Sequence, residues 1–227
     1  MVDWERNWKS AGIQFAVLSI VASAIYGNAP KQGASNGELV SFFDGDRTRV
    51  LIAAVVFCMS FLTLLWFGAA LASVLRDAGK AGWGAAATAS SAATGGMLFV
   101  LMATRASLAF SIAGAGHPQV TTAIYDASCV VAVMVSFPAA MFVMSGAFGL
   151  WRAAIISNRF FSVGVAAVVI VLLGGTTLAR SGVWSPGGAY DRVSFVILLL
   201  WIAVLSVVLL RRPATASNAV QAPIPAA

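Results

Sequence analysis

The sequence predicts an all-α fold, a polytopic transmembrane bundle of six helices with both termini in the cytoplasm. Of the 227 residues, 60% are hydrophobic and 10% are charged, and the mean hydropathy is +0.90. Soluble domains contain roughly 45–50% apolar and about 25% charged residues, so this composition excludes a soluble protein. The few charges divide the chain into uncharged runs, and a membrane-spanning helix needs about 20 such residues.

Cutting these runs where glycine and proline break helices gives the six elements. The predicted helices lie at about 11–27, 50–75, 84–113, 120–150, 160–180 and 192–211. Residues 1–212 therefore form one transmembrane domain. Residues 213–227 contain three prolines and no apolar periodicity, which predicts a disordered cytoplasmic tail.

The first helix has some features of a secretory signal, namely a short apolar run and the small residues Ala22-Ser-Ala24. However, Asp3 and Glu5 cancel the charges of Arg6 and Lys9, whereas a signal peptide opens on a net basic segment. We therefore expect the helix to be retained. Cleavage, the alternative, would leave five helices.

The longest loop, 28–49, lies outside in this topology and is predicted to contain a short helix at the membrane interface. Ser35 and Glu38 have the spacing of a capping box, and apolar residues follow them. A charged turn with Asp46, Arg47 and Arg49 then leads into the second helix. Two interpretations stay open, an ordinary solvated turn or the charged rim of an outer lid.

Single charges, Arg105 and Asp126, lie inside the third and fourth helices. The breaker between these helices is Gly114-Ala-Gly-His-Pro118, because glycine frees the backbone and proline disfavours helix at the preceding residue. One helix therefore ends near Ala113, and the next begins near Val120.

Small residues and helix breakers predict how the helices pack. The stretch 84–96 consists of Ala, Ser, Thr and Gly, which lets a neighbouring backbone approach closely, so the third helix is expected to be central. Pro138 in the fourth helix and Gly174-Gly175 in the fifth mark kinks. Such kinks either adjust local packing or free backbone carbonyl groups, which can then line a path through the bundle.

Basic residues set the predicted orientation in the cell membrane. Placing the N-terminus inside leaves eight lysines and arginines in cytoplasmic segments and five outside. This excess follows the positive-inside rule, which is why both termini are expected in the cytoplasm.

A run of specific residues resembles a known group of proteins. It comprises Glu38-Leu-Val-Ser-Phe-Phe43, Asp46-Arg-Thr-Arg49 and Leu64-Leu-Trp-Phe-Gly-Ala-Ala-Leu71, followed by Leu75 and Arg76. This pattern resembles uncharacterised six-helix bacterial membrane proteins of unknown function. The resemblance implies architecture and carries no activity.

The two intramembrane charges are predicted to pair. An ionisable group in a membrane helix costs a few kcal/mol or more and usually faces a partner inside the bundle. Measured along each helix from the shared turn, Arg105 lies roughly 13 Å and Asp126 roughly 9 Å below it. We therefore expect an ion pair in the outer half. It either fixes the register of the two helices or lines a cavity open to the outside, together with Thr122 and Cys129.

Other polar residues are predicted to form an outer rim: Asp46, Arg47, Arg49, His117 and Arg180. His117, the lone histidine, is either an ordinary loop residue or a pH-responsive group at the mouth of the cavity. No cluster with metal-ligand spacing accompanies it, so neither a metal nor a cofactor is expected.

The sequence favours a non-enzymatic module that binds or transports a small solute, with that solute and membrane lipid as its partners. The basic residues form no tract with interleaved aromatics, so nucleic acid is not expected as a partner. Nucleophile-elbow, zinc-protease and phosphate-loop motifs are absent from the sequence. An accessory subunit of a larger membrane complex is the alternative, and an intramembrane enzyme is a more distant one.

Overall fold

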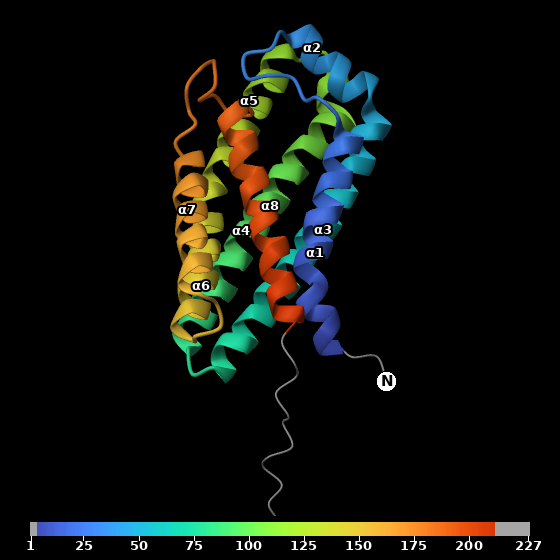
Figure 1. Ribbon diagram of the computed structural model, residues 1–227. Helices are drawn as coiled ribbons and strands as arrows, with labels where there is room; N and C mark the ends of the chain where they lie inside the picture. The colour runs from blue at the N-terminus through green and yellow to red at the C-terminus, as the bar shows by residue number, and fades with distance from the viewer. Residues whose placement is uncertain (1–3, 212–227) are drawn as a thin grey trace, which may run out of the picture.

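A computed structural model describes residues 4–211, so the predicted tail at 213–227 lies outside the described residues. Between residues 4 and 211 the secondary structure is helical, with no strand, and Figure 1 shows the helices side by side in one bundle. In chain order the segments are α1 (Trp4–Tyr26), α2 (Asn36–Val40), the π-helical turn η1 (Ser41–Gly45), α3 (Arg47–Asp77), α4 (Ala81–Ser107), the π-helical turn η2 (Leu108–Ile112), the 3-10 turn η3 (Ala113–Ala115), α5 (Pro118–Met134), α6 (Ser136–Arg152), α7 (Asn158–Gly174) and α8 (Ala189–Leu210).

The described chain has helices that suit a multi-pass membrane protein. Five stretches are long and apolar enough to cross a membrane, Arg6–Tyr26, Arg47–Asp77, Ala81–Ala115, Pro118–Arg152 and Ala189–Leu210. They coincide with five of the predicted helices. The remaining one, α7, is apolar but has 17 residues, which at 1.5 Å each gives about 26 Å against a hydrocarbon core of about 30 Å.

The first and last helices meet at one end of the bundle. α1 begins and α8 ends at this end, which we call the terminal end, while α2 covers the opposite end, the α2 end (Figure 1). The predicted capping box is present: the Ser35 amide donates to Glu38 Oε2 at 2.8 Å, and the Glu38 amide donates to Ser35 Oγ at 3.3 Å. Phe43, in the π-helical turn that follows, is fully buried, so this segment packs onto the bundle.

The third predicted helix is central, as the small residues indicate. α4 packs against α3, α5 and α6. A Cβ added at Gly84 would lie 2.9 Å from the carbonyl oxygen of Ala72, and one added at Gly68 would lie 2.1 Å from Ser91 Oγ. Only glycine at these positions lets α3 and α4 approach so closely.

The two charged residues predicted to lie inside helices do so, since α4 contains Arg105 and α5 contains Asp126.

The fourth predicted helix is broken into α5 and α6 at Val135. Pro138 has no amide hydrogen to donate to the carbonyl of Met134, four residues earlier, and α5 ends at that residue. The helical hydrogen bonding is therefore interrupted near Pro138, while Val135 keeps a right-handed helical backbone and Pro118–Arg152 forms one apolar stretch.

The fifth predicted helix is shorter than expected, because α7 ends at Gly174 instead of near residue 180. A Cβ at Gly174 would lie 2.5 Å from Ser194 Oγ of α8, and the Thr177 hydroxyl donates to the Gly174 carbonyl at 2.7 Å. The glycine pair ends the helix where a neighbouring helix comes closest, whereas the sequence suggested only a kink.

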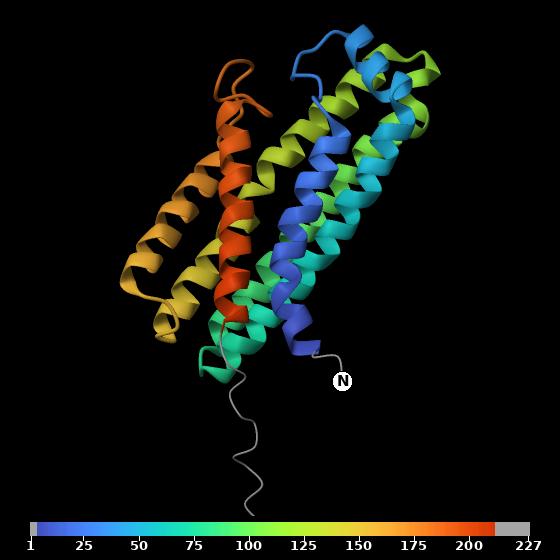
Figure 2. The ribbon, with the colours of Figure 1, turned by 45° about the vertical axis from the view of Figure 1, so that its right-hand side comes forward.

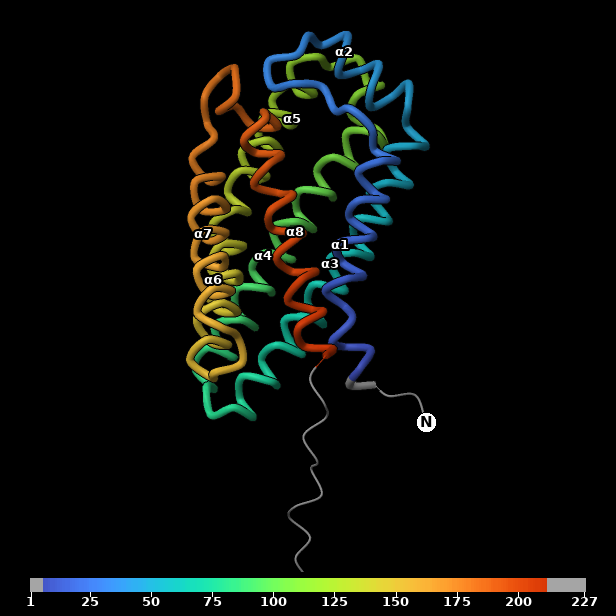
Figure 3. Tube along the Cα trace, viewed as in Figure 1, coloured from blue at the N-terminus to red at the C-terminus, as the bar shows by residue number. Residues whose placement is uncertain are grey.

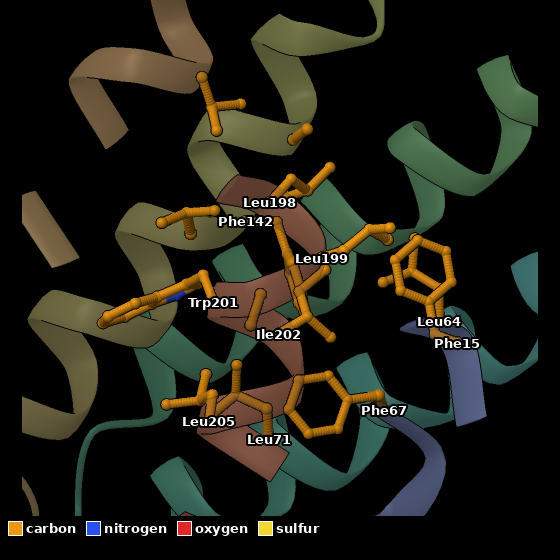
Figure 4. Packing of buried hydrophobic residues seen from close by; sticks show 14 of the residues in the cluster. Phe15, Leu64, Phe67, Leu71, Phe142, Leu198, Leu199, Trp201, Ile202 and Leu205 are labelled. Carbon is orange, nitrogen blue, oxygen red and sulfur yellow. The ribbon is translucent and has the colours of Figure 1, made fainter. Parts of the chain in front are cut away.

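The main core lies in the terminal half of the bundle. Figure 4 shows Ile202 and Leu205 of α8 facing Phe67 and Leu71 of α3, and all four side chains are buried. α1 joins this core through Phe15, which is also fully buried. Toward the α2 end, α1 and α8 diverge, as both Figure 1 and Figure 2 show.

Candidate functional site

A cavity of about 540 Å³ lies in the half of the bundle where α1 and α8 diverge. Its walls come from α1, α3, α4, α5, α6, α7 and α8, and residues of the loops after α1 and before α8 also line it. Figure 3 shows both loops at the α2 end. Val135, between α5 and α6, and Ser136, the first residue of α6, both line the cavity. The break therefore forms part of the cavity wall.

Arg105 of α4 is the charged group set deepest in this cavity. It is half-buried and its Nε atom is fully buried, with no hydrogen-bond partner. Its guanidinium carbon lies 5.7 Å from the ring centroid of Tyr26, a cation–π contact. No ion pair within 4 Å joins Arg105 to another residue of the described chain. Its charge is therefore compensated only in part.

Two tyrosines and a cysteine surround the guanidinium. Tyr26, Tyr125 and Cys129 line the same cavity as Arg105. The Tyr26 hydroxyl is buried without a hydrogen-bond partner, whereas the Tyr125 hydroxyl donates to the carbonyl of Pro30. Tyr125 thus ties the loop after α1 to the cavity wall.

The mouth of the cavity contains further charges. Asp191, at the start of α8, is the acidic residue that lines the cavity together with Arg105. It is also held by the backbone, because Gly187 donates its amide to Asp191 Oδ2 at 2.9 Å. Lys31 and Arg192 line the mouth as well. Among the described lining residues three side chains are basic and one is acidic, so the cavity carries an excess of positive charge.

The ion pair expected between Arg105 and Asp126 is absent. Asp126 does not line the cavity, and its Oδ1 atom is buried without a hydrogen-bond partner. Tyr125 and Cys129 are four residues apart on α5 and share the face that lines the cavity. Asp126 is one residue further on, about 100° around the helix, which turns it away from that face. The height of Asp126 along its helix was therefore not enough to predict its partner.

No protein-family model, curated protein or solved structure matches this chain.

The other predicted site residues lie outside this cavity. Thr122 donates to the carbonyl of Pro118 at 3.1 Å. At the rim, Arg49 pairs with Asp46 at 2.6 Å, and Arg47 lies over the ring of Phe110 at 5.3 Å. His117 and Arg180 are exposed.

Asp46 and Arg49 also border a second, open hollow, separate from Arg105. It lies between the loop after α1 and the segment of α2 and η1. The predicted rim residues are therefore at the expected end of the bundle but do not converge on one site. In the described part of the chain no three His, Cys, Asp or Glu side chains gather as metal ligands.

Sequence reasoning missed Tyr26, Lys31, Tyr125 and Asp191 as residues that line the cavity together with Arg105. One signal was available, because Tyr125 lies four residues before Cys129 and thus on the same helix face. No such signal pointed to Asp191. It lies in the first turn of α8, far from Arg105 in sequence, where a charge is typical of a helix boundary. Only the packing of α8 against α1, α6 and α7 brings Asp191 to the mouth of the cavity.

Proposed function

We propose that this chain is a non-enzymatic membrane module that binds or transports a small anionic solute in the cavity around Arg105. The observation that carries this proposal is a guanidinium in a cavity of about 540 Å³ with no ion pair. A charge inside a membrane helix is costly, and such residues commonly mark a solute path.

The size and charge of the cavity support an anion as the solute. Ligand pockets are commonly about 300–1,000 Å³, lined mostly by apolar side chains with a few convergent polar groups. The lining residues match that description, with basic side chains in excess over acidic ones. A carboxylate or phosphate would supply the ion partner that the Arg105 guanidinium lacks.

For the setting of this site, we propose a six-helix protein of the cell membrane with both termini in the cytoplasm. In this arrangement α7 is the sixth span, short enough to require local thinning of the bilayer or help from its flanking residues. The α2 end, and with it the mouth of the cavity, then faces outward. The resemblance to uncharacterised six-helix bacterial membrane proteins supports the same layout.

Thermal unfolding of the purified protein in a nonionic detergent tests the proposed function. Acetate, benzoate and methyl phosphate are compared with methylammonium and benzylammonium. A ligand that binds only the folded state raises the unfolding temperature with concentration. We expect at least one anion to do so, and neither ammonium ion.

The same titration of two variants assigns the effect to the cavity. Arg105→Gln is expected to abolish the stabilisation, whereas Arg180→Gln, which alters an exposed arginine outside the cavity, is expected to leave it unchanged. The proposal fails if no anion stabilises the wild-type protein, or if Arg105→Gln retains the full effect.

A further inference from the structure

The cavity suggests a more specific class of solute. We propose that its occupant is a single-chain anionic amphiphile of the fatty-acid type, whose headgroup binds Arg105 and whose hydrocarbon chain extends toward the terminal end. We further propose that it enters sideways from the surrounding lipid, through the gap between α1 and α8. This inference rests on the proposed function and goes beyond it by naming the ligand chemistry and the route.

The cavity is polar at one end and apolar at the other. Charged and hydroxyl-bearing residues lie at the mouth and around Arg105. Below Arg105 the walls become apolar, with Leu98 and Met102 on α4, Phe61 on α3 and Leu199 on α8. Leu98 lies seven residues before Arg105 on the helix, which corresponds to about 10 Å of apolar depth. A headgroup alone would leave this part of the cavity empty.

The gap between α1 and α8 opens only in the half toward the α2 end. Near the terminal end these helices touch: a Cβ at Gly12 would lie 2.9 Å from Ser206 Cβ, and the Ser206 hydroxyl donates to the Lys9 carbonyl. Nearer the α2 end, Ile20 of α1 and Val196 of α8 line the cavity, yet 59% and 50% of their surfaces remain exposed. The same side chains therefore face both the cavity and the outer surface of the bundle.

This geometry matches the orientation of an amphiphile in one leaflet of a bilayer. The stretch Ala81–Ala115 has 35 residues, more than the about 20 that a span needs. Arg105 lies in its last third, toward the α2 end, and Leu98 lies deeper. A lipid-like anion in that leaflet already points its headgroup toward the α2 end and its chain toward the bilayer centre. It can pass between α1 and α8 without turning over.

Photolabelling in nanodiscs of phosphatidylcholine tests this proposal. The probe is a fatty acid with a diazirine in its chain, and labelled peptides are mapped by mass spectrometry. We expect adducts on the residues that line the apolar part, around Phe61 and Leu199. Unlabelled decanoate should suppress these adducts, whereas methyl decanoate and decylammonium, which have the same chain length but no anionic headgroup, should not.

Variants connect the labelling to Arg105. Arg105→Gln should reduce it by roughly tenfold or more, because a hydrogen bond to a charged group contributes about 1.5–3 kcal/mol. Arg180→Gln is the matched control and should not change it. If Arg105→Gln does not fold, the comparison of decanoate with decylammonium on the wild-type protein still decides the question.

Three results would overturn the proposal: equal competition by decylammonium, adducts confined to the outer surface of the bundle, or suppression by phosphatidylglycerol in the nanodisc but not by decanoate. The last result would assign the cavity to a two-chain phospholipid instead. If the small anions raise the unfolding temperature and the photoprobe does not label the cavity, this inference fails while the proposed function stands. If neither ligand binds, both fail.

Discussion

Arg105 lacks the compensation that a charge inside a membrane bundle ordinarily has. It has a cation–π contact with Tyr26 and shares its cavity with Asp191, but it has no ion pair. Residues that break a general rule of protein packing are often found at functional sites, where binding requires what stability does not. The thermodynamic consequence can be measured.

Replacing Arg105 with leucine should make the protein more stable. The cation–π contact with Tyr26 contributes about 0.5–1 kcal/mol, less than the cost of holding an unpaired charge in this position. We expect Arg105→Leu to raise the free energy of unfolding by about 0.5–2 kcal/mol, seen as a higher unfolding temperature, while anion binding is lost. Arg180→Leu, on an exposed loop, should change stability by less than about 0.5 kcal/mol. A lower unfolding temperature for Arg105→Leu would contradict this expectation.

Double-mutant cycles can identify the acidic residue to which Arg105 is coupled. The variants are Arg105→Gln combined with either Asp191→Asn or Asp126→Asn, and the measurement is chemical unfolding in detergent. Since Asp191 lines the cavity with Arg105 and Asp126 does not, we expect a coupling of about 0.5 kcal/mol or more with Asp191 only. Additive effects at Asp191 together with coupling at Asp126 would reverse the assignment.

At the scale of the helices, the small residues of α4 divide into two groups. Gly84 touches the backbone of α3, whereas nothing lies within 4 Å of a Cβ added at Gly96, which is exposed. The same residue type therefore has opposite roles on two faces of one helix. At Gly84 it permits close packing, and at Gly96 it leaves a helix position less stable than alanine would make it.

This difference predicts that a glycine-to-alanine substitution changes stability in opposite directions at the two positions. Gly84→Ala places a Cβ 2.9 Å from the Ala72 carbonyl oxygen, which belongs to the backbone and cannot rotate away, so it should destabilise by about 1–3 kcal/mol. Gly96→Ala should stabilise by about 0.5–1 kcal/mol, because alanine restricts the unfolded chain and prefers helix. Chemical unfolding of both variants is the measurement. Destabilisation of similar size at both positions would indicate a general effect of helix propensity instead.

The break between α5 and α6 illustrates how one residue shapes the site. Pro138 interrupts the helix at Val135, and Val135, Ser136 and Ala139 then line the cavity. These residues lie within about one turn of Pro138. The place where the helical hydrogen bonding is interrupted is therefore also part of the cavity wall.

At the scale of the whole molecule, orientation decides which compartment the cavity serves. The loop between α7 and α8 and the segment around α2 lie at one end, and the turn between α3 and α4 lies at the other (Figure 1). If the termini are cytoplasmic, the α2 end is outside the cell.

Single cysteines at the two ends test this orientation. Ser181, in the loop before α8, and Asp77, at the end of α3, are both exposed. An impermeant thiol reagent applied to intact cells should label Ser181→Cys, and it should label Asp77→Cys only after permeabilisation. The native cysteines are half-buried and buried, and the unmodified protein measures their background. The opposite labelling pattern would place the termini outside.

The sequence by itself determined the helices and most of their limits. A span must be apolar and must satisfy its own backbone hydrogen bonds, so composition locates it without reference to any neighbour. Local chemistry was equally direct: the capping box at Ser35 and the break around Pro118 are formed by residues next to one another. Arg105 could be recognised as exceptional for the same reason, because its cost depends on its setting in an apolar helix.

Only the tertiary structure decided which side chains meet. Similar heights along their helices suggested that Arg105 and Asp126 pair, but the rotation of α5 about its axis places Tyr125 and Cys129 on the cavity and turns Asp126 away. That rotation is set by packing against several helices at once, and no local pattern encodes it. The divergence of α1 and α8, which opens the cavity, likewise depends on contacts between the two ends of the chain, as at Gly12 and Ser206.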